Sequence, residues 1–171
     1  GKRMLQRVFG FAGQPELAGR IAFVEDYGEQ LAQYMVHGVD VWLNNPLPPL
    51  EASGTSGMKA ALNGTLNFSV LDGWWREGYN GKNGWAVGSD QDYADPYQQD
   101  EADSKSLYDT LENEIIPLYY NNRGADGLPT EWISRVKECI RTLAPQFSTR
   151  RMLKEYLNTM YIPAMREAEK A

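Results

Sequence analysis

The stretch Glu51–Lys59, Glu-Ala-Ser-Gly-Thr-Ser-Gly-Met-Lys, holds the residues of this chain whose types and spacing could do chemistry. Its small residues leave backbone N–H groups open where a helix is predicted to begin, and such a helix N-terminus attracts anions. Thr55 and Ser56 add hydroxyl donors. Lys59 follows three to four residues later, so its amine should emerge one turn along the same helix face. The spacing predicts a phosphate-sized anion site beside an amine.

This pairing suits pyridoxal phosphate, whose phosphate needs fixed donors and whose aldehyde condenses with a lysine amine. A helix N-cap followed by an exposed lysine, or a plain phosphate or nucleotide loop, would explain the same residues. The segment lacks the Gly-x-x-x-x-Gly-Lys-Ser/Thr pattern of a P-loop and the Gly-x-Gly-x-x-Gly dinucleotide fingerprint, which weakens the nucleotide alternatives. Spacing alone gives an anion site with a nearby lysine and leaves these alternatives open.

Short apolar strands alternate with helices in the part of the chain that would position this segment. Helices are predicted over about 2–12, 29–36 and 56–62, and strands over 20–24, 39–43 and 65–71, with a shorter strand at 84–88. This alternation is typical of a doubly wound α/β layer with parallel strands. An open parallel sheet usually has about five or six strands, so the chain is expected to begin in the middle of a fold.

The C-terminal part of the chain is predicted to be helical. Apolar residues recur at spacings of three and four over 104–120, 130–143 and 149–169, after a loop over 72–97 that is rich in Gly, Asn, Asp and Trp. We therefore divide the chain into 1–100, a partial Rossmann-like cofactor- and sugar-binding region, and 101–171, a helical region.

Several conspicuous side chains are interpreted as structural. Four aromatic residues could stack on sugars, but a core beneath the long loop is favoured: Trp74, Trp75, Tyr79 and Trp85. Cys139 lies on the apolar face of its helix and is expected to be inert core. The acidic residues from Asp90 to Asp103 are expected to form a solvated loop, and no metal site is predicted.

Composition excludes some classes of protein. A net charge of −6 argues against binding to a nucleic-acid backbone, since such proteins concentrate basic residues. A single cysteine cannot form an internal disulfide, and no apolar run approaches the roughly 20 residues that span a membrane. The basic start of the chain has no apolar region behind it, so no signal peptide is predicted and the expected compartment is the cytoplasm.

Several motifs together resemble the signature region of the α-glucan phosphorylase family, which includes glycogen, starch and maltodextrin phosphorylases. They are Glu51–Thr55, Met58-Lys59, Leu62–Gly64, Asp72-Gly73 and the upstream run Phe23–Tyr27. The similarity extends over nearly the whole chain, and Ser56-Gly57 with Trp74-Trp75 resembles the shorter bacterial and archaeal form. The resemblance implies the C-terminal part of a Rossmann-like, GT-B type glycosyltransferase domain with a helical C-terminal extension.

The resemblance also implies a role for each residue of the segment. Lys59 would carry pyridoxal 5'-phosphate as a Schiff base. The cofactor phosphate would be held by Thr55, Ser56 and Gly57, and Tyr27 would lie against the pyridine ring. The transferred glucose would be gripped by Glu51, Ala52, Ser53 and Gly54.

The family reaction is reversible phosphorolysis of an α-1,4-glucan to glucose 1-phosphate. In it the cofactor phosphate exchanges a proton with the substrate phosphate. The implied partners are the glucan, inorganic phosphate, glucose 1-phosphate and a missing N-terminal part of the same protein, without which this fragment is expected to be inactive. Oligomerisation is left open. Two alternatives remain: a nucleotide-sugar-dependent glycogen or starch synthase, and a non-catalytic glucan-binding module.

Overall fold

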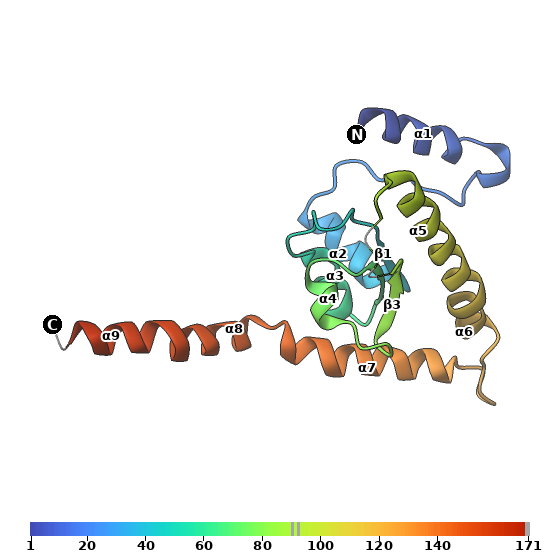
Figure 1. The fold of residues 1–171 in the computed structure, drawn as a ribbon. Coiled ribbons are helices and arrows are strands. Elements are labelled where there is room, and N and C mark those ends of the chain that lie inside the picture. The colour runs from blue at the N-terminus through green and yellow to red at the C-terminus, as the bar shows by residue number, and fades with distance from the viewer. Residues whose placement is uncertain (90, 92, 170–171) are drawn as a thin grey trace. The chain divides into compact units, whose positions relative to one another are not determined.

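The chain forms two compact units, Gly1–Met35 and Val36–Ala171. The computed structural model describes residues 1–89, 91 and 93–169 (Figure 1). Asp90 and Asp92 of the predicted acidic loop therefore lie outside the described residues.

The first unit begins with the predicted helix, α1 (Lys2–Ala12), followed by a 3₁₀ turn, η1 (Pro15–Leu17). The strand predicted over 20–24 is wrong, because these residues have no regular structure. Phe23 instead packs edge-on against Phe9 of α1, with ring centroids 6.2 Å apart. An apolar run becomes a strand only beside a partner strand that accepts its backbone hydrogen bonds, and the described residues of this unit contain none.

The second unit is built on a parallel three-stranded sheet in the order β1-β2-β3. The strands are β1 (Val41–Asn44), β2 (Leu66–Val70) and β3 (Gly84–Val87). These three strands confirm the predictions to within two residues at each end and confirm an α/β fold. The helix α2 (Glu29–Gly38) precedes β1, and α3 (Thr55–Leu62) connects β1 to β2, again close to the predicted bounds.

The central strand β2 is buried along its whole length. It is paired on both edges, and its side chains alternate between the two faces of the sheet, as in any strand. Asn67 therefore faces away from Phe68, and its amide Nδ2 donates to the carbonyl oxygen of Gly57 in α3, 3.0 Å away. The sheet thus fixes the helix that carries the predicted site.

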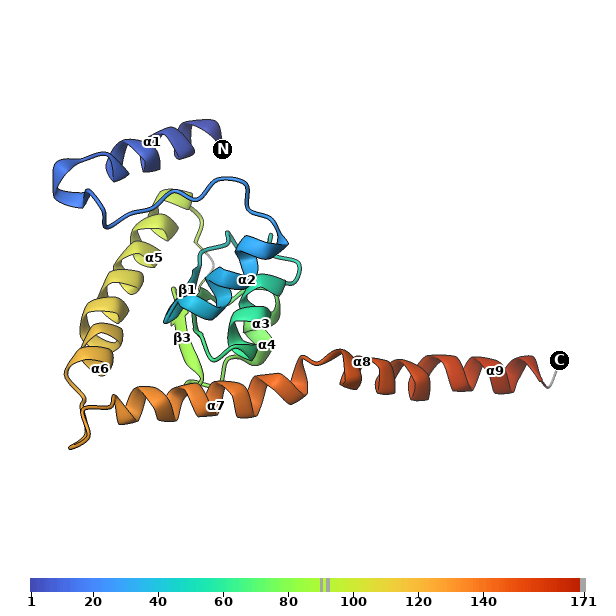
Figure 2. The same cartoon turned by 180° about the vertical axis from the view of Figure 1, so that it is seen from behind.

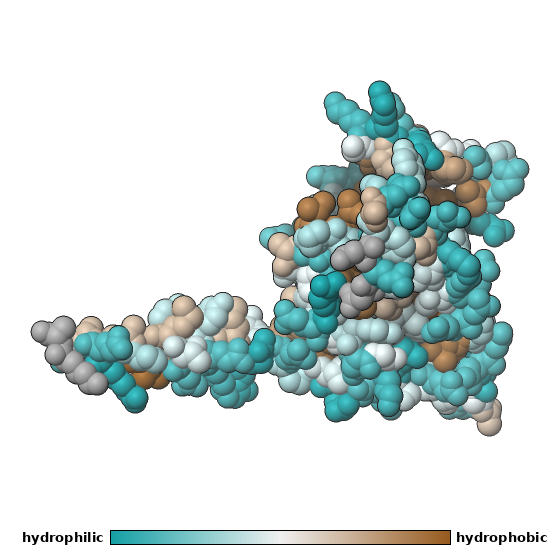
Figure 3. Space-filling view, in the orientation of Figure 1, coloured by the Kyte–Doolittle hydropathy of each residue, from teal (hydrophilic) through white to brown (hydrophobic). Residues whose placement is uncertain are grey.

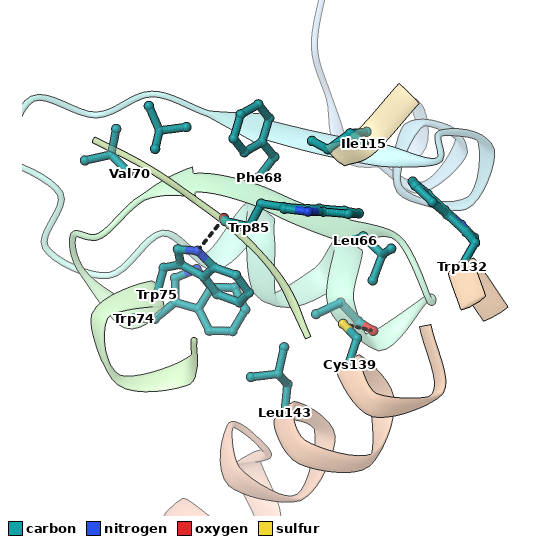
Figure 4. Close-up of a cluster of buried hydrophobic side chains, with 12 residues drawn as sticks. Leu66, Phe68, Val70, Trp74, Trp75, Trp85, Ile115, Trp132, Cys139 and Leu143 are labelled. Atoms are coloured by element: carbon teal, nitrogen blue, oxygen red, sulfur yellow. Dashed lines mark hydrogen bonds between the residues drawn. The ribbon is translucent and has the colours of Figure 1, made fainter. Parts of the chain in front are cut away.

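Aromatic side chains fill the core beside the sheet (Figure 4). Trp74, Trp75 and Trp85 are buried, which confirms their interpretation as core. The Trp75 Nε1–H group donates to the carbonyl oxygen of Trp85, 3.1 Å away. Trp74 and Trp75 lie on a short helix, α4 (Trp74–Gly78), within the segment predicted as loop. Five residues are too few to show a helical period, so periodicity could not reveal this element.

Of the remaining helices, those predicted from 130 and 149 begin where predicted, the one predicted from 104 begins earlier, at Pro96, and the first and last are each divided by a π-helical turn. They are α5 (Pro96–Thr110), α6 (Ile116–Tyr120), α7 (Thr130–Gln146), α8 (Thr149–Tyr156) and α9 (Ile162–Ala168). The start at Pro96 is set by the Asp95 carboxylate, which caps the helix by accepting from the Tyr97 N–H group at 3.0 Å. In both views α7 passes below the part of the unit that holds α3 and α4, and it is in contact with α3 (Figures 1 and 2).

Two π-helical turns interrupt the long helices, η2 (Leu111–Ile115) and η3 (Leu157–Tyr161). Each is followed after one residue by a proline, Pro117 or Pro163. Proline has no N–H group to donate, and its ring clashes with the carbonyl of residue i−4, so the widened turn relieves that clash.

The last helical stretch, Thr149–Ala168, has no buried side chain among its described residues. Apolar and polar residues lie side by side on its surface (Figure 3). Most of its exposed large apolar residues recur at helical spacing: Met152, Leu153, Tyr156, Leu157, Met160, Tyr161 and Met165. Within the described parts of the chain, no helix has both the length and the apolar character that crossing a membrane requires.

Candidate functional site

The segment Glu51–Lys59 lies in the second unit, where an irregular loop after β1 enters α3. The helix begins at Thr55, one residue before the predicted start. Gly54 precedes it in a left-handed conformation, with φ 87° and ψ 48°, which glycine adopts without the steric cost of a side chain. The left-handed turn at Gly54 therefore directs the chain into the helix that begins at Thr55.

The first turn of α3 leaves donors open. Within the described residues, no acceptor is recorded for the N–H groups of Thr55 and Ser56, as expected for the first positions of a helix. The Gly57 N–H group is different, because it donates to the carbonyl oxygen of Gly54 at 3.2 Å. Two backbone donors and the exposed Thr55 hydroxyl therefore meet at the positive end of the helix dipole.

The two faces of α3 have different roles. Gly57, Ala60 and Ala61 are buried, so the small residues of the helix pack into the core. Thr55 and Lys59, one turn apart, are both exposed. The amine and the open end of the helix consequently share the outer face, as the spacing predicted.

Glycine is required where the helix meets the core. A Cβ atom at Gly57 would lie 2.6 Å from Asn67 Oδ1 and 3.0 Å from Trp74 Nε1. A Cβ atom at Gly54 would lie 3.0 Å from Trp74 Cδ1 and 3.3 Å from Glu51 Oε1. The Trp74 indole therefore lies beside both Gly54 in the loop and Gly57 in α3, and the Glu51 carboxylate lies beside Gly54.

The predicted sugar-binding residues lie in the loop ahead of α3. Glu51 and Gly54 are half-buried, while Ala52 and Ser53 are exposed. The Glu51 N–H group donates to Asp72 Oδ2 at 2.9 Å, and the Ser53 carbonyl accepts from the Trp74 N–H group at 2.8 Å. The loop is thus attached to the connection between β2 and α4.

Tyr27 belongs to the first unit and not to the one that holds Lys59. It lies in the irregular segment before α2 and is exposed. Its predicted place against the cofactor ring stays a prediction.

Of the residues that support the site, Asn67 and Asp72 had no predicted role, and Trp74 was predicted only as core. Asn67, Asp72 and Trp74 lie after the segment in the sequence and reach it only through the fold. The signals in the sequence were the Asp72-Gly73 and Trp74-Trp75 pairs, which formed part of the family resemblance without an assigned function in the site.

Comparison with known proteins identifies the family. The sequence profile of the carbohydrate phosphorylase family matches residues 14–116. The chain is 60% identical over 167 residues to a glycogen phosphorylase of Aquifex aeolicus, covering 98% of this chain and 24% of that protein. It is 51% identical over 168 residues to a maltodextrin phosphorylase of Thermococcus litoralis, covering 98% of this chain and 20% of that protein.

A glycogen phosphorylase of Mycobacterium tuberculosis is 44% identical over 164 residues, which is 96% of this chain and 19% of that protein. The chain therefore spans about a quarter or less of the length of these relatives. The profile match covers well over half of the chain, and the similarity to each relative runs through nearly all of it. The chain belongs to the carbohydrate phosphorylase family.

Proposed function

We propose that this chain is part of an α-glucan phosphorylase that catalyses reversible phosphorolysis of α-1,4-glucan to glucose 1-phosphate. The observation that carries the proposal is the loop and helix start at Glu51–Lys59, with open N–H groups and an exposed lysine on one helix face. It occurs in a chain that is 60% identical to a glycogen phosphorylase over nearly its whole length. The family implies a cofactor, and we propose pyridoxal 5'-phosphate.

The residues of α3 fit this cofactor. The open N–H groups and the hydroxyls of Thr55 and Ser56 suit a phosphate, and Gly57 turns its Cα toward the core and leaves the outer face of the helix to them. Lys59 would hold the aldehyde end, and Gly57 and Tyr27 are proposed as further contacts. When bound, the cofactor supplies a phosphate group that exchanges a proton with the substrate phosphate. The donors at the helix start therefore hold the group that takes part in the reaction.

The loop ahead of α3 is proposed to bind the transferred glucose. A carboxylate such as Glu51 accepts hydrogen bonds from sugar hydroxyls, and backbone N–H groups of Ala52, Ser53 and Gly54 donate to them. Their attachment to Asp72 and Trp74 supports this assignment, because a binding loop must be held in one conformation.

We also propose the larger context of the chain. The parallel sheet and its helices are compatible with a Rossmann-like domain of GT-B type, with residues 1–100 as the cofactor- and sugar-binding region and 101–171 as the helical region. Because the relatives are about four to five times as long as this chain, we propose that activity requires a longer protein that supplies the substrate-phosphate site.

The test uses the full-length protein that carries this chain. Borohydride reduction followed by peptide mass spectrometry should find a pyridoxyl adduct on Lys59, and maltodextrin with inorganic phosphate should give glucose 1-phosphate. Lys59→Ala should abolish both signals. The control Lys82→Ala, at an exposed lysine outside the segment, should retain both. A wild-type protein that carries no adduct and forms no glucose 1-phosphate would overturn the proposal.

A further inference from the structure

We infer that Asp72 is a positioning residue for the sugar-binding loop, and that it acts on Glu51 through the backbone. The inference rests on the proposed function, because it assigns Asp72 a part in binding the transferred sugar. Asp72 lies two residues after the end of β2, and its own N–H group donates to the carbonyl oxygen of Val70, the last residue of the strand, at 2.9 Å. The residue is thus anchored to the end of the central strand.

Both carboxylate oxygens of Asp72 are used by backbone donors. Oδ2 accepts from the Glu51 N–H group at 2.9 Å, and Oδ1 accepts from the Gly73 N–H group at 2.9 Å. Hydrogen bonds to an ionised acceptor are stronger than neutral ones and fix geometry more firmly. A carboxylate engaged in this way holds the backbone of the loop on one side and that of Gly73 on the other.

The next two residues bring the backbones into contact. Gly73 has φ +51°, and a Cβ atom there would lie 2.6 Å from the Ser53 carbonyl oxygen, so glycine is needed for the close approach. The Trp74 N–H group then donates to the same Ser53 oxygen at 2.8 Å. Glu51 and Ser53, the two residues that flank Ala52, are therefore each held by one hydrogen bond.

The loop has little other support. Residues 51–53 lie outside any helix or strand, so no ladder of backbone hydrogen bonds fixes them. Across the described ranges, the hydrogen bonds recorded for these residues go to Asp72 and Trp74. Loss of the Asp72 carboxylate would free the Glu51 end of the loop, while α3 and its first turn keep their contacts with Asn67.

The kinetic consequence follows from geometry. Displacing a substrate-positioning group by about 1 Å can cost up to about a hundredfold in rate. We therefore expect Asp72→Ala to lower kcat/KM for phosphorolysis by about tenfold to a hundredfold. Asp72→Asn keeps one acceptor oxygen but places an NH2 donor against the second backbone N–H group. Its loss of kcat/KM should therefore lie between wild type and Asp72→Ala.

The experiment compares these variants in the full-length protein with Asp95→Ala. Asp95 is a matched control, because its carboxylate also accepts from a backbone N–H group in the same unit, but at the start of α5. Three quantities are measured: kcat/KM with maltodextrin and inorganic phosphate, pyridoxal phosphate bound per chain, and hydrogen exchange of the Glu51 amide. The expected result is a graded loss of kcat/KM at Asp72, with cofactor content unchanged, faster exchange at Glu51, and Asp95→Ala within twofold of wild type.

The inference is overturned if Asp72→Ala stays within twofold of wild type, or if Asp95→Ala loses as much activity as Asp72→Ala. A wild-type protein that forms no glucose 1-phosphate would count against the proposed function instead. In that case hydrogen exchange at the Glu51 amide tests the inference by itself. The inference fails if this amide exchanges as slowly in Asp72→Ala as in wild type.

Discussion

The side chain of Asn67, on the central strand, donates a hydrogen bond to the carbonyl oxygen of Gly57, 3.0 Å away in the first turn of α3. Asn67 is buried, and its Oδ1 atom lies close enough to Gly57 to exclude a side chain there. Asn67 therefore fixes the distance between α3 and the sheet, and it restricts position 57 of the helix to glycine. Lys59 is carried by the same helix.

Replacing Asn67 with alanine should destabilise the protein by about 1–3 kcal/mol, because a buried hydrogen bond is lost and a cavity forms. Asn63→Ala is the matched control, since its Nδ2 also donates to a carbonyl of α3, that of Lys59, but on the exposed surface. Urea unfolding should show a loss below about 1 kcal/mol for the control. Equal losses in the two variants would contradict the anchoring role of Asn67.

A methyl group at Gly57 should also be costly. Gly57→Ala places a Cβ atom 2.6 Å from Asn67 Oδ1, and forcing atoms into a packed site costs about 1–3 kcal/mol. Gly38, at the end of α2, has no neighbouring heavy atom within 4 Å of the same position. Gly38→Ala should therefore be neutral or stabilising by up to about 1 kcal/mol. Thermal unfolding of the two variants checks the difference, and a stable Gly57→Ala protein would show that the site can relax.

The Trp75 indole should be the most costly aromatic ring to remove. It is fully buried, and its Nε1–H group is satisfied by the Trp85 carbonyl. Trp75→Ala should cost about 3–5 kcal/mol through cavity formation. Tyr97, which is 83% exposed on α5, provides the comparison, and Tyr97→Ala should change stability by no more than about 0.5 kcal/mol. Denaturant midpoints of the two variants measure the difference. Similar losses of stability in Trp75→Ala and Tyr97→Ala would contradict the prediction.

The Cys139 thiol should be unreactive in the folded protein. Burial raises the pKa of Cys139 from 9.0 to about 12, and the side chain is in contact with the carbonyl of Ala61. Since the thiolate is the reactive form, iodoacetamide at neutral pH should label the protein only when urea unfolds it. Labelling in buffer at the rate seen in urea would contradict the burial of this group.

The same pKa shift predicts an alkaline loss of stability. A thiol whose pKa is raised by folding favours the folded state fully below the unfolded value of 9.0, and this contribution is lost as the pH rises toward about 12. Unfolding free energies measured across that interval should fall less steeply for Cys139→Ala than for wild type. Parallel slopes would show that other groups cause the alkaline loss.

The sequence by itself determined the local elements and the chemistry of one segment. Spacing predicted α1 and α3 nearly to the residue and placed Thr55 and Lys59 on one helix face, because helical periodicity and glycine stops are local properties. It also carried the family resemblance, which comparison with known proteins confirmed.

The tertiary structure decided what depends on partners distant in the sequence. The run 20–24 is apolar but has no strand beside it, so composition alone could not make it a strand. Asp72 and Trp74 hold the loop of Glu51 and Ser53 through single hydrogen bonds across about twenty residues, and no periodicity records such a pairing. The sequence therefore shows which side chains could do chemistry. The contacts that orient these side chains form only when β2 and α4 are folded beside the loop.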